Sequence, residues 1–113
     1  MLAKQYRLKK NKEFDLVFQK GKYIGGSLFF LLFKENKLSD NRFGFVIGKK
    51  ISKKATVRNK IRRRISEIIR TIMDNIKPGF DIVVGAKTEV IGKDYREIKE
   101  NLEELFRKAK LIK

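Results

Sequence analysis

Apolar residues recur every three or four positions through the middle of the chain and predict one long amphipathic helix. The stripe consists of Val57, Ile61, Ile65, Ile68, Ile72 and Ile76, with Ile69 widening it. Thr56 is the expected N-cap, and Pro78-Gly79 ends the element because proline and glycine stop a helix. The pattern therefore predicts a helix between Thr56 and Pro78 that buries its isoleucine face.

Two further helices are expected near the ends of the chain. Asn11 can cap a short helix that stops at Gly21. The apolar positions of this short helix are Phe14, Val17 and Phe18. Asp94 and Glu97 have the spacing of a capping box for the last helix. The inward positions of the last helix are Ile98, Leu102, Leu105 and Phe106.

Three segments read as short strands. The apolar run Leu28–Phe33 predicts a buried strand, the alternation in residues 43–48 predicts a second, and Phe80–Val84 a third. Residues 23–27 read as a turn and residues 34–42 as a polar hairpin loop. Three helices packed on a small mixed sheet form an α+β sandwich, and residues 1–113 fit a single domain without repeats or linkers.

Charge narrows the possible partners. The chain has 29 Lys and Arg against 13 Asp and Glu, which gives a net charge of +16. A compact domain with that charge favours a polyanion, with nucleic acid as the first candidate and an anionic membrane as the second. No apolar run approaches the roughly 20 residues that span a bilayer, and the N-terminus lacks the apolar core of a signal peptide.

The absence of cysteine and histidine argues against several classes of enzyme. The chain contains neither residue, which excludes disulfides, thiol nucleophiles and the usual zinc sites. It also removes the commonest general base. The aspartates are scattered and form no metal motif, so we expect neither a catalytic residue nor a metal site. The composition favours a binding protein.

The positive charge is concentrated on the long helix and just before it. Residues 41–66 include ten basic residues and no acid. At 100° per residue, Asn59, Lys60, Arg62, Arg63 and Arg70 point away from the isoleucine stripe, and Arg58 lies near its edge. A solvated helix face is the plain alternative. However, unpaired like charges repel each other, whereas guanidinium groups suit phosphate. The pattern therefore favours nucleic-acid binding.

The same segment resembles a known family. The run Arg58-Asn59-Lys60-Ile61-Arg62-Arg63 is similar to the Arg-Asn-Arg-rich motif of the bacterial ribonuclease P protein family. Three other segments look like family features in family order, so the resemblance covers nearly the whole chain. These segments are Arg7-Leu8-Lys9-Lys10 leading into Phe14 and Phe18, Lys49-Lys50-Ile51, and Leu105-Phe106-Arg107-Lys108.

The resemblance implies a fold and a role. It implies an uncommon left-handed βαβ crossover, with the arginine-rich helix as the connection. It also implies the protein subunit of ribonuclease P, which binds the catalytic RNA and the 5′ leader of precursor tRNA. The RNA carries out the cleavage with Mg²⁺ that it largely holds itself. We therefore expect a cytoplasmic protein with no membrane contact and no obligate protein partner.

The resemblance also implies two sets of site residues. Those expected to bind RNA are Lys49, Lys50, Lys53, Lys54, Arg58, Asn59, Lys60, Arg62, Arg63 and Arg70. Those expected to line a cleft for the leader are Phe14, Phe18, Phe30 and Leu32, with Arg58, Asn59 and Arg62 at its edge. Without the resemblance, Phe14 and Phe18 would read as core residues, because aromatic residues four apart on a short helix usually pack inward.

The chain departs from the family pattern at three places. Lys60 stands where arginine is common, Ser66 stands where a basic residue is expected, and the connection over residues 52–57 is one residue longer. Three rival functions stay open at this point. They are a ribosomal or tRNA-chaperoning RNA-binding protein, a protein-only nuclease, and a protein of the membrane surface.

Overall fold

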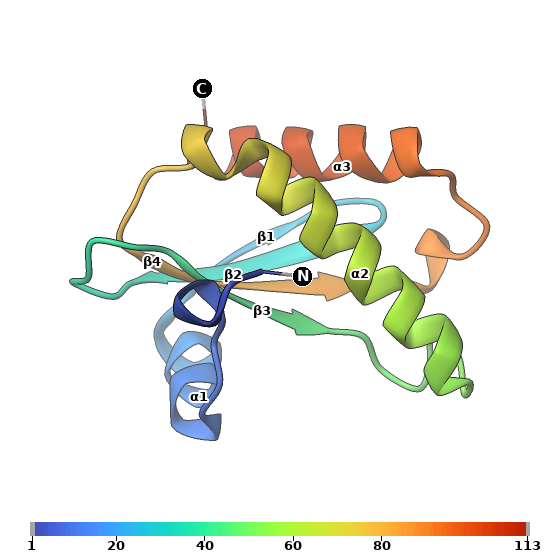
Figure 1. Ribbon diagram of the computed structural model, residues 1–113, viewed down its shortest axis with the longest axis horizontal. Coiled ribbons are helices and arrows are strands. Elements are labelled where there is room, and N and C mark those ends of the chain that lie inside the picture. Colours follow the sequence, from blue (N-terminus) through green and yellow to red (C-terminus); the bar gives the residue numbers. More distant parts are fainter. Residues whose placement is uncertain (1, 113) are drawn as a thin grey trace.

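The structure, a computed structural model, describes residues 2–112 and contains three helices and four strands. The helices are α1 (Asn11–Lys20), α2 (Ala55–Ile72) and α3 (Tyr95–Lys108), and the strands are β1 (Lys22–Gly25), β2 (Phe29–Glu35), β3 (Arg42–Val46) and β4 (Phe80–Ala86). The strands form one mixed sheet in the order β1-β2-β4-β3. Figure 1 shows α2 and α3 on one face of this sheet and α1 on the other. The predicted α+β class is confirmed.

The strand order differs from the predicted hairpin. Residues 34–42 do not join neighbouring strands, because β4 lies between β2 and β3. β2 pairs with β4 in antiparallel fashion, whereas β3 and β4 are parallel and are joined through α2. Parallel neighbours need a crossover connection, and α2 provides it. The left hand of this crossover stays a prediction from the resemblance.

β1 replaces most of the predicted turn over residues 23–27. Residues 22–25 pair with residues 33–30 of β2 at the edge of the sheet. Lys22 and Tyr23 are exposed in this strand, so its sequence carries little of the apolar alternation that identifies buried strands.

The main core lies between the sheet and the α2–α3 layer. Phe29, Leu31 and Phe33 of β2 point into it and are buried, whereas the residues between them face α1. The isoleucines of α2 and the four predicted inward residues of α3 complete this core. One face of the sheet therefore packs into the main core, and the opposite face is directed toward α1.

Two of the three predicted helix caps are wrong. α2 begins at Ala55 with Lys54 as N-cap, and α1 includes Asn11, with Lys10 as N-cap. Glu13 takes over the capping of α1, since its Oε1 accepts the backbone N–H groups of Lys9 at 3.0 Å and Lys10 at 3.1 Å. The predicted cap of α3 is confirmed, because the Asp94 carboxylate accepts the Glu97 N–H at 2.9 Å.

An ion network fastens α1 to the sheet. Arg42 of β3 donates from Nε and Nη2 to the two carboxylate oxygens of Asp81 in β4, at 2.8 and 2.7 Å. Its Nη1 donates to Oε2 of Glu13 at 2.6 Å. Burial raises the pKa of the Glu13 carboxyl, but the two backbone N–H groups and the charge of Arg42 outweigh burial and hold this pKa below its usual value. The ionised form of Glu13 therefore stabilises the fold.

This network predicts a pH-dependent loss of stability on Glu13→Gln. The folded pKa lies below the unfolded one, so the contribution is present above the unfolded value near 4.5 and is lost as the pH falls through the folded value. We expect Glu13→Gln to lower the free energy of unfolding by roughly 1–2 kcal/mol at neutral pH. The difference from the unmodified protein should shrink in acid, as measured by denaturant unfolding across pH.

Glu67→Gln is the matched control for this measurement. Glu67 pairs with Arg70 at 3.0 Å on an exposed face of α2, where an ion pair contributes little. Equal losses in the two variants, or a loss on Glu13→Gln that does not change with pH, would contradict the network's proposed role.

Candidate nucleic-acid interface

α1 covers only part of its face of the sheet. Val17 is the buried residue of this helix, and it packs with Val83 of β4 and Leu8 of the N-terminal segment. Phe14, Leu32 and Val46 pack around this small cluster and are only partly buried. An apolar surface, here called the aromatic face, therefore stays accessible beside α1. It consists of Phe14, Phe18, Tyr23, Phe30, Leu32 and Val46.

Two glycines let aromatic rings approach the backbone of the sheet. A Cβ atom at Gly85 of β4 would overlap the ring of Phe30, which is its partner in β2. A Cβ atom at Gly44 of β3 would overlap the ring of Phe14. Tyr23 stacks on Phe30 with ring centroids 5.7 Å apart and planes 26° apart. The rings are thus held in place by the sheet without being enclosed in a core.

Exposure separates the residues of the aromatic face from ordinary core residues. The predicted cleft residue Phe18 is 47% exposed and Tyr23, which was not predicted to line the cleft, is 58% exposed, whereas Phe29 on the opposite sheet face is 1% exposed. Phe14, Phe30 and Leu32 are half-buried. The alternative in which Phe14 and Phe18 are both core residues is therefore wrong for Phe18. An exposed phenylalanine beside half-buried rings can accept an unstacked base.

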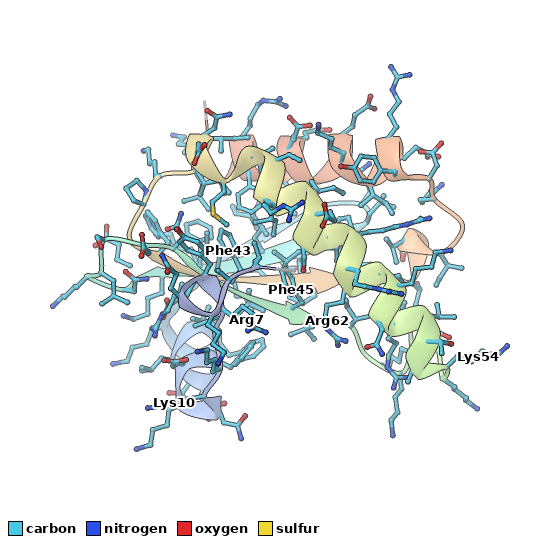
Figure 2. The ribbon with its side chains drawn as sticks, viewed as in Figure 1. Arg7, Lys10, Phe43, Phe45, Lys54 and Arg62 are labelled. Carbon is cyan, nitrogen blue, oxygen red and sulfur yellow. The ribbon has the colours of Figure 1, made fainter. Side chains whose placement is uncertain are left out.

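A hollow of about 220 Å³ connects the aromatic face to α2. It lies between the N-terminal segment, β3 and α2, and its lining includes Arg7, Phe14, Phe45, Arg62 and Ser66. Figure 2 labels Arg7, Phe45 and Arg62 in this region. Lys10 and Lys54 are also labelled and lie at the N-terminal ends of α1 and α2. The structure thus brings Arg62 and Phe14, two predicted cleft residues, into one site.

Arg7 belongs to this hollow, although it was not among the predicted site residues. Its segment is placed by a bridge between Arg7 and Phe43, with the Leu8 N–H donating to the Phe43 carbonyl at 2.9 Å. The Nε of Arg7 is buried and has no hydrogen-bond partner within residues 2–112. A buried guanidinium N–H without an acceptor is costly, so this arginine lowers stability at a position that also lines the hollow. The basic start of the chain was the available sequence signal.

Arg62 also borders a groove along the outer side of α2. This groove has a volume of about 420 Å³ and is lined by Thr56, Asn59, Arg62, Arg63 and Ser66. The Arg62 Nη1 donates to the Asn59 Oδ1 at 2.8 Å, which orients both side chains. Ser66 is 3% exposed and donates to the Arg62 carbonyl at 2.9 Å. Ser66, one of the departures from the family pattern, therefore lines both the hollow and this groove.

The other predicted RNA-binding residues are distributed around the N-terminal half of α2 and beyond. Lys49, Lys50, Lys53 and Lys54 are exposed on the segment that leads into the helix, and Lys60 and Arg63 are exposed on the helix. Arg58 is not directed into either hollow, since its Nη1 donates to the Ser52 carbonyl at 2.8 Å and secures that leading segment. Arg70 lies two turns further along α2 and pairs with Glu67.

Acidic groups offer little for metal binding on this surface. Within residues 2–112 no group of three or more His, Cys, Asp or Glu residues lies close enough to hold a metal ion. Glu13 and Asp81 lie near the aromatic face, but Arg42 engages both of them. The described chain also has no helix long and apolar enough to cross a bilayer.

This combination defines a class of protein. A small basic domain with an aromatic sheet face, a flanking arginine helix and no cluster of acids is a nucleic-acid-binding protein with features suited to single strands. The family model described as Ribonuclease P matches residues 2–110. The chain belongs to the ribonuclease P protein family.

Similar proteins cover nearly the whole chain. The ribonuclease P protein component of Synechocystis sp. is 38% identical over 112 residues, covering 98% of this chain and 90% of that protein. The component of Clostridium acetobutylicum is 39% identical over 111 residues, covering 96% and 92%. The RNase P protein structure from Staphylococcus aureus has a TM-score of 0.88 at 30% identity, covering 96% and 98%. That from Thermotoga maritima has a TM-score of 0.84 at 34% identity, covering 90% and 96%.

The family assignment establishes the general role. The protein is a subunit of ribonuclease P and acts with RNA in the 5′ processing of tRNA, with catalysis carried by the RNA subunit. The resemblance recognised in the sequence is thereby confirmed. The family assignment therefore favours this role over the three alternatives that the sequence left open, namely a ribosomal or tRNA-chaperoning protein, a protein-only nuclease and a protein of the membrane surface.

The exposure of Phe18 generates a matched test on α1. Phe18→Ala should change the free energy of unfolding by less than about 1 kcal/mol, because the side chain is half exposed. It should weaken binding of a single-stranded leader oligonucleotide by roughly 1–3 kcal/mol if a base stacks there. Leu16→Ala is the control, since Leu16 is also 47% exposed on the same helix. A separation of two residues places it on the other side of the helix from Phe18. Titration calorimetry with unfolding curves would measure both quantities, and equal affinities of the two variants would exclude stacking on Phe18.

Proposed function

We propose that the aromatic face binds the single-stranded 5′ leader of precursor tRNA, while α2 and its leading segment dock on the catalytic RNA of ribonuclease P. The observation that carries this proposal is the position of Arg62. This residue lines both the hollow that contains Phe14 and the groove along α2. One guanidinium can therefore contact a phosphate between a base stacked on the aromatic face and RNA lying along the helix.

The aromatic face suits a leader of varied sequence. Stacking on Phe18, Tyr23 or Phe30 requires only the flat face of a base, which every nucleotide offers. The hollow adds a positively charged end to this surface, because Arg7 and Arg62 both line it and a guanidinium suits phosphate. These features support binding to the leader with modest preference for sequence.

The proposed docking surface for the catalytic RNA is electrostatic. Lys49, Lys50, Lys53 and Lys54 lie before the first turn of α2, whose N-cap makes no side-chain hydrogen bond. The free N–H groups of that turn add positive potential, which favours a phosphate nearby. Together with Lys60 and Arg63, they supply contacts to sugar and phosphate that position the protein without reading bases.

Mg²⁺ enters this proposal through the RNA. We expect the catalytic ions to be held mainly by RNA phosphates, and the positive surface of the protein to reduce the repulsion between leader and catalytic RNA. This screening should lower the concentration of Mg²⁺ that the holoenzyme needs. We further propose that the protein works in the cytoplasm with the catalytic RNA and precursor tRNA as partners, without an obligate protein partner.

Arg62→Ala tests the shared position of the two hollows. We expect roughly tenfold weaker binding of precursor tRNA to the reconstituted holoenzyme at low salt, and a smaller loss at high salt because the contact is ionic. Arg96→Ala is the control, because the Arg96 side chain is 87% exposed on α3 and its one ion pair within residues 2–112 is with Glu100 on its own helix. Binding is measured by filter retention across a salt series. Unchanged affinity of a folded Arg62→Ala protein at low salt would refute the proposed surface.

A further inference from the structure

A second concentration of positive charge lies away from the aromatic face. A groove of about 500 Å³ is formed where the ends of α1 and α3 meet the start of β1, the end of β2 and the start of β4. Six lysines line it, namely Lys20, Lys22, Lys34, Lys77, Lys108 and Lys110. Glu35 is the single acidic residue in this lining. We call this feature the lysine groove.

Charge balance within the protein does not account for the lysine groove. Among residues 2–112, none of the six lysines makes a salt bridge within 4.0 Å of a carboxylate. The negative ends of the α1 and α3 dipoles stabilise Lys20 and Lys108. However, Lys22, Lys34 and Lys77 lie outside those last turns. Six like charges around one concavity repel each other, so the groove is complementary to a ligand with several negative charges.

The floor of the groove indicates how such a ligand is recognised. Phe33 and Phe80 pack edge to face with ring centroids 6.1 Å apart, and Leu111 is 2% exposed. These side chains belong to the main core or pack against it, so they leave no free ring for a base. Lysine ammonium groups contact phosphates as point charges and lack the fork of arginine. The groove is therefore suited to a phosphate backbone without base readout.

Lys110 occupies a backbone conformation that usually takes glycine after a helix, with a φ of 62° in the left-handed region. The Lys110 and Leu111 N–H groups donate to the Arg107 and Phe106 carbonyls, each at 2.9 Å, and close the end of α3 in the manner of a Schellman motif. Glycine would satisfy the same hydrogen bonds with less strain, so lysine costs conformational energy at a position that lines the groove.

The groove and the proposed docking surface lie at opposite ends of α2. Arg58 to Arg63 occupy the N-terminal half of this helix, whereas Lys77 follows its C-terminal end. The 18 residues of α2 span about 27 Å at 1.5 Å per residue. Figure 1 shows these two ends of α2 on opposite sides of the molecule. A contact at the groove would therefore be spatially separate from the contacts at the N-terminal half of α2.

We infer that the lysine groove is a second RNA-binding surface, which contacts the sugar-phosphate backbone of the catalytic RNA at a segment separate from the one docked on α2. This inference rests on the proposed function, because it requires the catalytic RNA as partner. With both surfaces engaged, the protein bridges two RNA segments, and the groove contributes affinity for the catalytic RNA without contributing to leader binding.

The experiment compares two charge-matched triple variants of the full chain. The groove variant combines Lys22→Gln, Lys77→Gln and Lys110→Gly. The control combines Arg96→Gln, Lys99→Gln and Lys37→Gly, all of which lie outside the lining of the groove. Lys37 matches Lys110 because its φ of 61° is also left-handed. The probes are transcribed ribonuclease P RNA from the same genome, a single-stranded leader oligonucleotide and anionic phosphatidylglycerol vesicles.

We expect the groove variant to bind the catalytic RNA about tenfold more weakly at moderate salt, with the slope of log affinity against log salt reduced by roughly two to three. The control should lose less than about threefold, and both variants should bind the leader oligonucleotide like the unmodified protein. Thermal unfolding checks that both are folded. If a triple variant unfolds, the affinities of the single variants Lys110→Gly and Lys37→Gly for the catalytic RNA are compared instead. Glycine relieves backbone strain at both positions, so these single variants should fold.

Equal losses for the two variants would overturn the inference, because they would reflect net charge alone. A loss confined to vesicle binding would also overturn it and would assign the groove to a lipid surface. Failure of the proposed function has a different signature. In that case the leader oligonucleotide would not bind the unmodified protein, whatever the groove variant does with the catalytic RNA.

Discussion

The position of α1 depends on Arg42. This side chain joins β3, β4 and α1 in one network, because it holds both oxygens of Asp81 and one oxygen of Glu13. Arg42 and Asp81 are paired in the register of the parallel strands, so their side chains lie on the same face of the sheet. α1 is a short helix with a single buried apolar residue, Val17. A helix with so little apolar contact has a marginal docking energy of its own, and the ion network sets where it lies.

This placement produces the binding surface. A helix that covered the whole second face would convert Phe30 and Leu32 into core, and no helix at all would leave Val83 unprotected. The partial cover leaves aromatic rings accessible beside a stable sheet, and Gly44 and Gly85 let these rings rest against the backbone. The other face, packed under α2 and α3, supplies most of the core, so the aromatic face is free to serve binding. Arg62 then borders that surface from α2, a helix fixed by its own buried isoleucines.

Much of this architecture was predictable from the sequence, and the failures have physical causes. The isoleucine stripe predicted α2, and the spacing of Asp94 and Glu97 predicted the start of α3, because both signals are local. β1 was missed since an edge strand with exposed Lys22 and Tyr23 lacks the alternation of a buried strand. The strand order was missed because apolar runs show which residues are buried but not which strands pair. Arg62 was identified through the family motif. Arg7 and the lysine groove were missed because only the fold brings their distant segments together.

Leader binding by the aromatic face is tested most directly by cleavage of precursor tRNA by the catalytic RNA at low magnesium, with and without this protein. Two substrates are compared, one with a leader of several nucleotides and one with a leader of a single nucleotide. We expect the protein to stimulate cleavage, and to do so more strongly for the longer leader. The protein alone should cleave neither substrate. Equal stimulation of the two substrates by the folded protein would show that the aromatic face does not hold the leader. Absence of stimulation with cognate RNA would contradict the account as a whole.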